Sequence, residues 1–67
     1  MLDYSLVVWA FGHVVETVLI EAASVEDAFD RARQHSGLTT DLELLNGDRL
    51  VARLRAGEAR WSVLAPA

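Results

Sequence analysis

Two histidines, His13 and His35, are the residues of this sequence best suited to exchange protons near neutral pH. His13 falls in a predicted turn. His35 falls in the last turn of a predicted helix, where a positive charge suits the negative end of the helix dipole. No serine-histidine-acid set, phosphate-binding glycine loop or metal-ligand spacing accompanies them, and the chain contains no cysteine. We therefore interpret both histidines as solvated or capping residues rather than as catalytic ones.

Two acidic residues, Glu16 and Glu21, interrupt a stretch that is otherwise apolar. They lie on opposite or uncertain faces of the predicted strand, so they do not form the carboxylate pair that acid-base catalysis uses. Glu16 fits either a charged residue that protects a strand edge or a partner for an arginine, and a functional role for it stays open. These residues predict a protein that is not an enzyme and that uses no cofactor or metal.

The basic residues are all arginine, and they gather at one end of the chain. Residues 1–48 carry nine acids and two arginines, a balance of −7, whereas residues 49–67 carry four arginines and one acid, a balance of +3. The predicted last hairpin places on one face Arg49, Arg53, Arg55 and Arg60. Such a row could hold phosphates, and β-ribbons do bind nucleic acid. The net charge of −4 and the lack of interleaved aromatic residues favour a solvated face that pairs with acids.

Residues 22–37 are predicted to form the one helix of the chain. Ser24 is a good N-cap, and Asp27 stands three residues later, close to the pattern of a capping box. One apolar stripe follows the helical period, at Val25, Ala28, Phe29 and Ala32. Gly37 can end the helix in the left-handed conformation. The two alanines of the stripe indicate close approach to a sheet.

Five stretches rich in β-branched and aromatic residues are predicted to be strands. They cover residues 3–11, 14–22, 41–45, 49–56 and 59–65. Gly12 and His13 form the predicted turn of the first hairpin, whose loop length is left open. Both faces of that hairpin carry apolar residues, whereas a strand with one wet face should alternate. We therefore expect the first hairpin to be covered on both sides.

The register of the second hairpin depends on Asn46 and Gly47, the strongest turn signal in the chain. A two-residue loop there would mix polar with apolar partners. A three-residue loop of residues 45–47 pairs Leu42 with Leu50 and keeps the faces in phase, so we predict that loop.

The last two strands are predicted to be joined by a two-residue turn that begins at Gly57. On the core face this turn pairs Leu54 with Trp61 and Ala52 with Val63. Pro66, which cannot donate to a ladder, is predicted to end the pairing.

The order of these elements predicts a single α+β domain over residues 1–67. It has two layers and the order β-β-α-β-β-β, with one helix packed on a mainly antiparallel sheet. A helix of about 12 residues covers two or three strands, so we expect one sheet face to stay half uncovered and the other to carry no helix. The alternative is a sheet that curls into a half-barrel and buries its own inner face.

The uncovered apolar residues form the predicted partner interface: Val7, Trp9, Phe11, Val15 and Leu19. A chain of 67 residues has a marginal core, and without cysteine it has no disulfide to reinforce it. Burial against a second chain is the device that remains. We therefore expect a homodimer in which sheets face each other or edges pair.

Length and composition also bear on the location of the protein. With 52% hydrophobic residues the chain should fold rather than stay disordered. Its apolar runs are too short to span a bilayer, and residues 1–4 lack the positive charge of a signal peptide. We expect a cytoplasmic protein without membrane contact. Residues 18–29, a strand that runs into an alanine-rich capped helix, resemble the pattern of many small bacterial and phage α+β proteins but carry no functional motif.

Together these features predict a small non-enzymatic protein-interaction or accessory module that works as a homodimer. The alternative is a nucleic-acid-binding protein that uses the arginine-lined hairpin.

Overall fold

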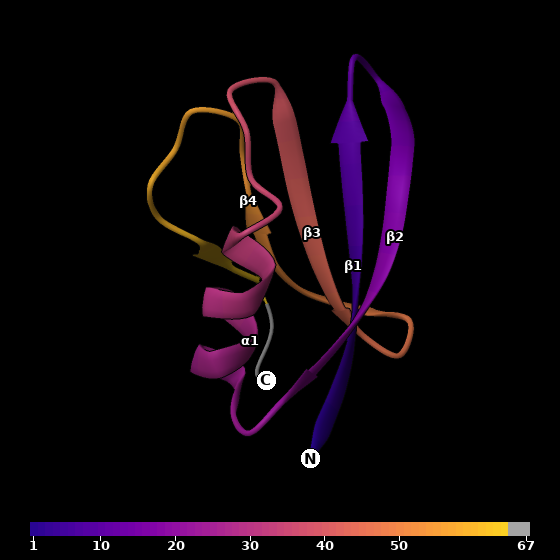
Figure 1. Cartoon of the computed structure of the whole chain (residues 1–67), viewed down its shortest axis with the longest axis vertical. Coiled ribbons are helices and arrows are strands. Elements are labelled where there is room, and N and C mark those ends of the chain that lie inside the picture. The colour runs from indigo at the N-terminus through magenta and orange to yellow at the C-terminus, as the bar shows by residue number, and fades with distance from the viewer. Residues whose placement is uncertain (65–67) are drawn as a thin grey trace.

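One helix packs on a five-stranded antiparallel sheet, which confirms the predicted α+β class (Figure 1). The structure is a computed structural model and describes residues 1–64. The strands lie in the order β2-β1-β3-β4-β5. The elements in chain order are β1 (Leu2–Ala10), β2 (His13–Ala22), α1 (Val25–Arg33), β3 (Thr40–Asn46), β4 (Arg49–Leu54) and β5 (Ser62–Val63).

The helix connects two strands that are parallel to each other but not adjacent. Strands β2 and β3 both pair antiparallel with β1, on its two sides. Strand β1 therefore lies at the centre of this half of the sheet, and α1 crosses over it from β2 to β3. The sheet stays open, because β2 and β5 form its two ends.

The start of α1 follows the sequence pattern closely. The Ser24 side chain accepts a hydrogen bond from the backbone N–H of Asp27 at 3.1 Å. The Asp27 carboxylate in turn accepts from the backbone N–H of Ala23 at 2.9 Å and from Nε of Arg31 at 3.0 Å. The bond to Ser24 satisfies a free donor of the first turn, and the bond from Ala23 resembles the return bond of a capping box but reaches the residue before the N-cap. The predicted N-cap is therefore confirmed, with aspartate in place of the usual glutamate.

The end of α1 differs from the prediction at Gly37. We expected Gly37 to be left-handed, but the glycines with positive φ in the described chain are Gly12, Gly47 and Gly57. The last turn instead tightens, because the N–H groups of His35 and Ser36 donate to carbonyl groups three residues earlier. These bonds satisfy the free carbonyls, so a left-handed terminator is not needed.

The bonds around Asp27 make the stability of the fold depend on acid pH. The N–H of Ala23 and the side chain of Arg31 lower the pKa of the Asp27 carboxyl below its usual 3.8. Because the pKa is lowered in the folded state, the ionised Asp27 carboxylate stabilises the fold above pH 3.8. This stabilisation is lost as the pH falls through the lower pKa of the folded state. We expect Asp27→Asn to lose less thermal stability than the native chain when the pH is lowered through this range. Equal acid sensitivity of the two chains in thermal melts would contradict this expectation.

The core lies between α1 and the side of the sheet that faces it, which we call the inner face. Its buried residues come from all elements except β5: Tyr4, Leu6, Val8, Ile20, Ala22, Ala28, Ala32, Leu42, Leu44, Val51, Ala52 and Leu54. Ala28 and Ala32 are fully buried, as expected for a helix that approaches a sheet closely. The accessible surface of 4343 Å² is near the roughly 4,200 Å² typical of a compact monomer of this mass.

The second hairpin has a different register from the one predicted. Leu42 pairs with Leu54 rather than with Leu50, and Asn46 pairs with Arg49, so the loop has two residues. The prediction was wrong because the register shifts between Leu44 and Leu45, which leaves Val51 as an extra residue in β4. Such a bulge brings the two strands back into phase, so a two-residue loop no longer mixes polar with apolar partners.

The first hairpin also contains a bulge. Phe11 and Gly12 form its turn, one residue earlier than predicted, with φ angles of 54° and 78°. Positive φ at both central residues is typical of the type I′ turn of tight hairpins. The register then shifts opposite Val8 and Trp9, which leaves Val15 as the extra residue of β2.

The segment after β4 completes the cover of the inner face. The predicted pair of Ala52 with Val63 is confirmed, but β5 contains only Ser62 and Val63 instead of residues 59–65. The rest of that prediction, from Ala65 on, lies outside the described residues. Residues 55–61 form a loop whose Trp61 ring stacks on Phe29, with centroids 5.1 Å apart. The expectation of a half-open inner face was therefore wrong.

The same loop is tied to the helix by a hydrogen bond. Arg33 donates from Nη1 to the carbonyl oxygen of Ala59 at 2.8 Å. The loop also begins with an anchored turn, because the Asp41 carboxylate accepts from the N–H of Ala56 at 2.7 Å. A loop held at both ends adds an apolar ring to the cover of α1 without adding a strand.

Candidate interaction surface

The side of the sheet away from α1, which we call the outer face, carries no helix in the described part of the chain (Figure 1). The register shows which residues share this face. Ser5 of β1 pairs with Leu19 on one side and Leu45 on the other, and Leu45 pairs with Leu50. Three leucines therefore cross the sheet in one row, interrupted only by the small Ser5.

A polar group lies beside this leucine row. Glu43 accepts a hydrogen bond from Nε1 of Trp9 at 2.7 Å, and its second oxygen pairs with Nη2 of Arg53 at 3.1 Å. Glu43 and Arg53 are directly paired across β3 and β4, and Val7 neighbours Glu43 on β1. The predicted three-residue loop would set Glu43 opposite Arg49, whereas in the structure Glu43 pairs with Arg53.

Removal of the Glu43 carboxylate should weaken the fold modestly. Glu43→Ala is expected to cost about 1–2 kcal/mol of unfolding free energy, because it removes one charge-assisted and one ordinary hydrogen bond that are partly exposed. Glu43→Gln should cost less, since its amide oxygen can still accept from Trp9. Urea denaturation of the three chains tests this order, and a larger loss for Gln than for Ala would contradict it.

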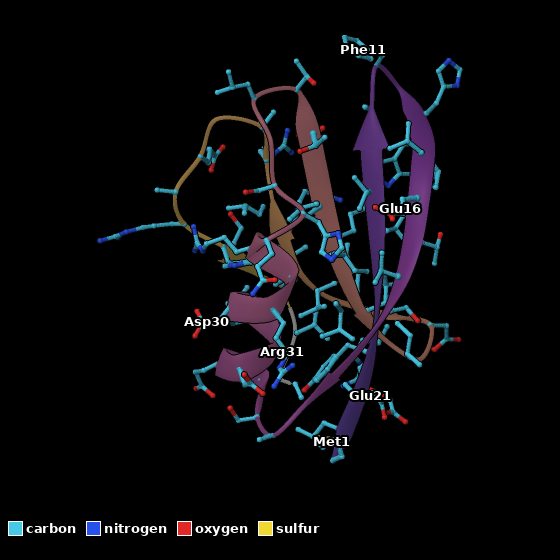
Figure 2. All side chains as sticks on the ribbon, in the orientation of Figure 1. Met1, Phe11, Glu16, Glu21, Asp30 and Arg31 are labelled. Atoms are coloured by element: carbon cyan, nitrogen blue, oxygen red, sulfur yellow. The ribbon has the colours of Figure 1, made fainter. Side chains whose placement is uncertain are left out.

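The predicted interface residues lie in three places: on the outer face, in the bulge of β2 and in the turn of the first hairpin. Val7 and Trp9 are half-buried on the outer face, and Leu19, on the same face, is 66% exposed. Val15 is the bulged residue of β2. Phe11 lies in the turn at the tip of the first hairpin and is 82% exposed (Figure 2). The five residues therefore belong to β1, β2 and their turn, but they do not form one flat face.

Strand β2 lies at one end of the sheet and, within the described chain, pairs only with β1. Its other edge therefore has no neighbouring strand. Apart from Val18, Ile20 and Ala22, the residues of β2 are exposed. An open hollow of about 340 Å³ runs beside this edge, between residues 18–21 and three side chains at and after the end of α1, Arg31, Gln34 and His35. An exposed edge strand with free backbone groups can pair with another chain.

The four arginines of the nucleic-acid alternative do not share one face. Arg49 pairs with Asn46, one position beyond the outward-facing pair of Leu45 and Leu50, so the bulge puts Arg49 and Arg53 on opposite sides. Arg60 lies in the loop before β5.

An open hollow of about 230 Å³ combines two of these arginines with two acids. It is lined by Trp9, Gly12, Asp41, Glu43, Arg53 and Arg55. Arg53 is already paired with Glu43, so this hollow carries little net positive charge.

Of the two histidines and the two strand acids, the structure brings together Glu16 and His35. His13 begins β2, directly after the turn, and pairs with Ala10. Glu16 pairs with Val8 and so lies on the inner side, where its Oε1 is 3.7 Å from Nδ1 of His35. Glu21 pairs with Asp3 on the other side, and Figure 2 shows Glu16 and Glu21 far apart along β2. Within the described residues no three His, Cys, Asp or Glu side chains gather as metal ligands.

Comparison of the chain with protein-family models, with curated proteins and with solved structures finds no match. Over residues 1–64, the helix is too short and too polar to cross a membrane. The proposal that follows therefore depends on the surface of the chain itself.

Proposed function

We propose that the chain is a small non-enzymatic protein-interaction or accessory module that acts as a homodimer. The observation that carries this proposal is the position of the exposed apolar residues. Four of the nine exposed large apolar residues of the described chain belong to β2 or to the turn before it, beside an unpaired strand edge: Phe11, Val14, Val15 and Leu19. Apolar side chains next to free backbone groups form the kind of surface that a second chain can cover.

The character of the two hollows supports a binding role over a catalytic one. Both are open, and each contains an arginine that is already paired with an acid, Arg53 with Glu43 in one and Arg31 with the nearby Asp27 in the other. A catalytic site would need a group free to exchange a proton or attack a substrate in a sheltered position. We therefore assign these polar residues a structural role at the surface.

Solution mass measured over a range of concentrations tests the proposal. Sedimentation equilibrium of the native chain is expected to show the mass rise from 7.4 kDa toward twice that value as the concentration increases. Raised salt should leave this change largely intact, because apolar burial is not screened as charge attraction is. A mass that stays at 7.4 kDa at millimolar concentration would disprove the homodimer.

A further inference from the structure

We propose that two copies pair antiparallel through β2, with the two-fold axis at Leu19, to form one continuous ten-stranded sheet. This inference rests on the proposed function, namely that the chain binds a second copy of itself. It adds which surface is used, in which register, and why the assembly stops at two chains.

The regular part of the β2 edge has its midpoint at Leu19. Pairing with β1 is continuous from Glu16, opposite Val8, to Ala22, opposite Leu2. The bulge at Val15 disrupts the ladder just before this segment, so residues 16–22 are the length of edge that can pair regularly. These residues span about 23 Å. Their central residue, Leu19, is also the most exposed apolar side chain within the segment, at 66%.

A two-fold axis at Leu19 brings compatible residues together. Leu19 meets the partner's Leu19 on the outer face, and Val18 meets the partner's Ile20 on the inner face. Thr17 meets the partner's Glu21, and Glu16 meets the partner's Ala22. Each residue meets one from the same face, because the pairs are an even number of positions apart. No glutamate stands opposite another glutamate, a contact that would destabilise the sheet.

Neighbouring registers are worse. An axis between Val18 and Leu19 sets Glu16 opposite the partner's Glu21 and joins inner to outer faces. An axis at Val18 sets Glu21 opposite the bulged Val15, and an axis at Ile20 leaves only a shorter segment to pair. The register at Leu19 is therefore the one that uses the whole regular edge.

The charges beside the edge fit the same register. The partner's Glu16 would arrive opposite Ala22 on the inner side of the sheet. Arg31 lies next to that position, because its Nε and the N–H of Ala23 share the same oxygen of Asp27, at 3.0 and 2.9 Å. Arg31 also lines the hollow beside the β2 edge. A cation therefore stands where the partner's carboxylate would enter.

The fold also explains why such an assembly closes at two chains. Pairing around a two-fold axis uses both β2 edges. The other end of the sheet is β5, which has only two residues and thus offers a short ladder. The bulge at Val15, which otherwise protects a strand edge, limits pairing to the regular segment that follows it.

A matched pair of leucine substitutions tests the surface. Leu19→Lys would set two positive charges against each other on the axis and remove two apolar side chains, so the dimer should weaken on the order of 100-fold. The monomer should stay folded by circular dichroism, because Leu19 is exposed. Leu38→Lys is the control, since it makes the same change at a side chain that is 91% exposed and far from β2 in sequence. A dimer that Leu19→Lys leaves intact would overturn the edge model.

Cysteine cross-linking tests the register directly, because the native chain has no cysteine. A mixture of Thr17→Cys and Glu21→Cys chains is expected to form disulfide-linked dimers under mild oxidation, whereas either variant alone should form few. Ser5→Cys, in the middle of the outer face, should not cross-link, but it would if two sheets stacked face to face. That result, with a dimeric native chain, would overturn the edge pairing and leave the homodimer standing. A native chain that is monomeric at every concentration would remove both proposals.

Discussion

Leu44→Ala is expected to remove a large share of the free energy of unfolding, the largest loss of the substitutions considered. Leu44 is fully buried and lies in β3, paired with Leu6 on one side and Ala52 on the other. Truncation of such a leucine costs about 2–5 kcal/mol, because the surrounding strands cannot collapse to fill the space. A domain of this length has about 3–10 kcal/mol of stability in total. Urea denaturation followed by circular dichroism measures the loss.

Leu45→Ala is the matched control, since the same change is made one residue along the same strand. Leu45 is half-buried on the outer face, where it pairs with Leu50. Its truncation removes fewer contacts and leaves no closed cavity, so we expect less than half of the loss seen for Leu44. A larger loss at Leu45 than at Leu44 would mean that the two faces of β3 are exchanged.

Trp61→Ala is expected to have the second largest effect, about 2–4 kcal/mol. The Trp61 ring stacks on Phe29 at an angle of 21° and closes the core at the end where the sheet has its shortest strand. Its loss would uncover Phe29 and release the loop of residues 55–61. Thermal unfolding gives the size of the effect, and Trp9 then remains as the single fluorescent reporter of the outer face.

Trp61→Phe separates the packing of this ring from its polar atom. Nε1 of Trp61 is buried and finds no acceptor among the described residues. A buried donor without a partner costs free energy, so a phenyl ring that keeps the stack should change stability little or raise it slightly. If Trp61→Phe lowers the stability as much as Trp61→Ala does, the N–H group of Trp61 contributes a hydrogen bond and this explanation is wrong. If Ala costs almost nothing, the loop does not belong to the core.

The apolar residues on the outer side of the first hairpin could be predicted by type but not by arrangement. Trp9 and Leu19 are large apolar residues in a hairpin with too many of them to bury, and this excess is visible in the composition of the strands. The hydrogen bond from Trp9 to Glu43 could not be predicted in this way, because the two residues are 34 positions apart in the chain. The prediction that the arginines share one face was wrong for a related reason. One extra residue, Val51, turns Arg49 to the side opposite Arg53.

Local signals in the sequence were enough for the start of the helix and the class of fold. Ser24 and Asp27 are close together in the chain, and their bonds form within one turn, so their pattern can be read directly. The class follows from the order of such elements.

Only the tertiary structure decided the register of the second hairpin, the position of β1 between β2 and β3, and the use of residues 55–61 as cover for the helix. Each of these depends on how well distant apolar side chains fit together. The bulge at Val51, for example, is stable because it buries both Val51 and Ala52 against the core. The free energy of such packing comes from contacts between segments far apart in the chain, which no short sequence pattern contains.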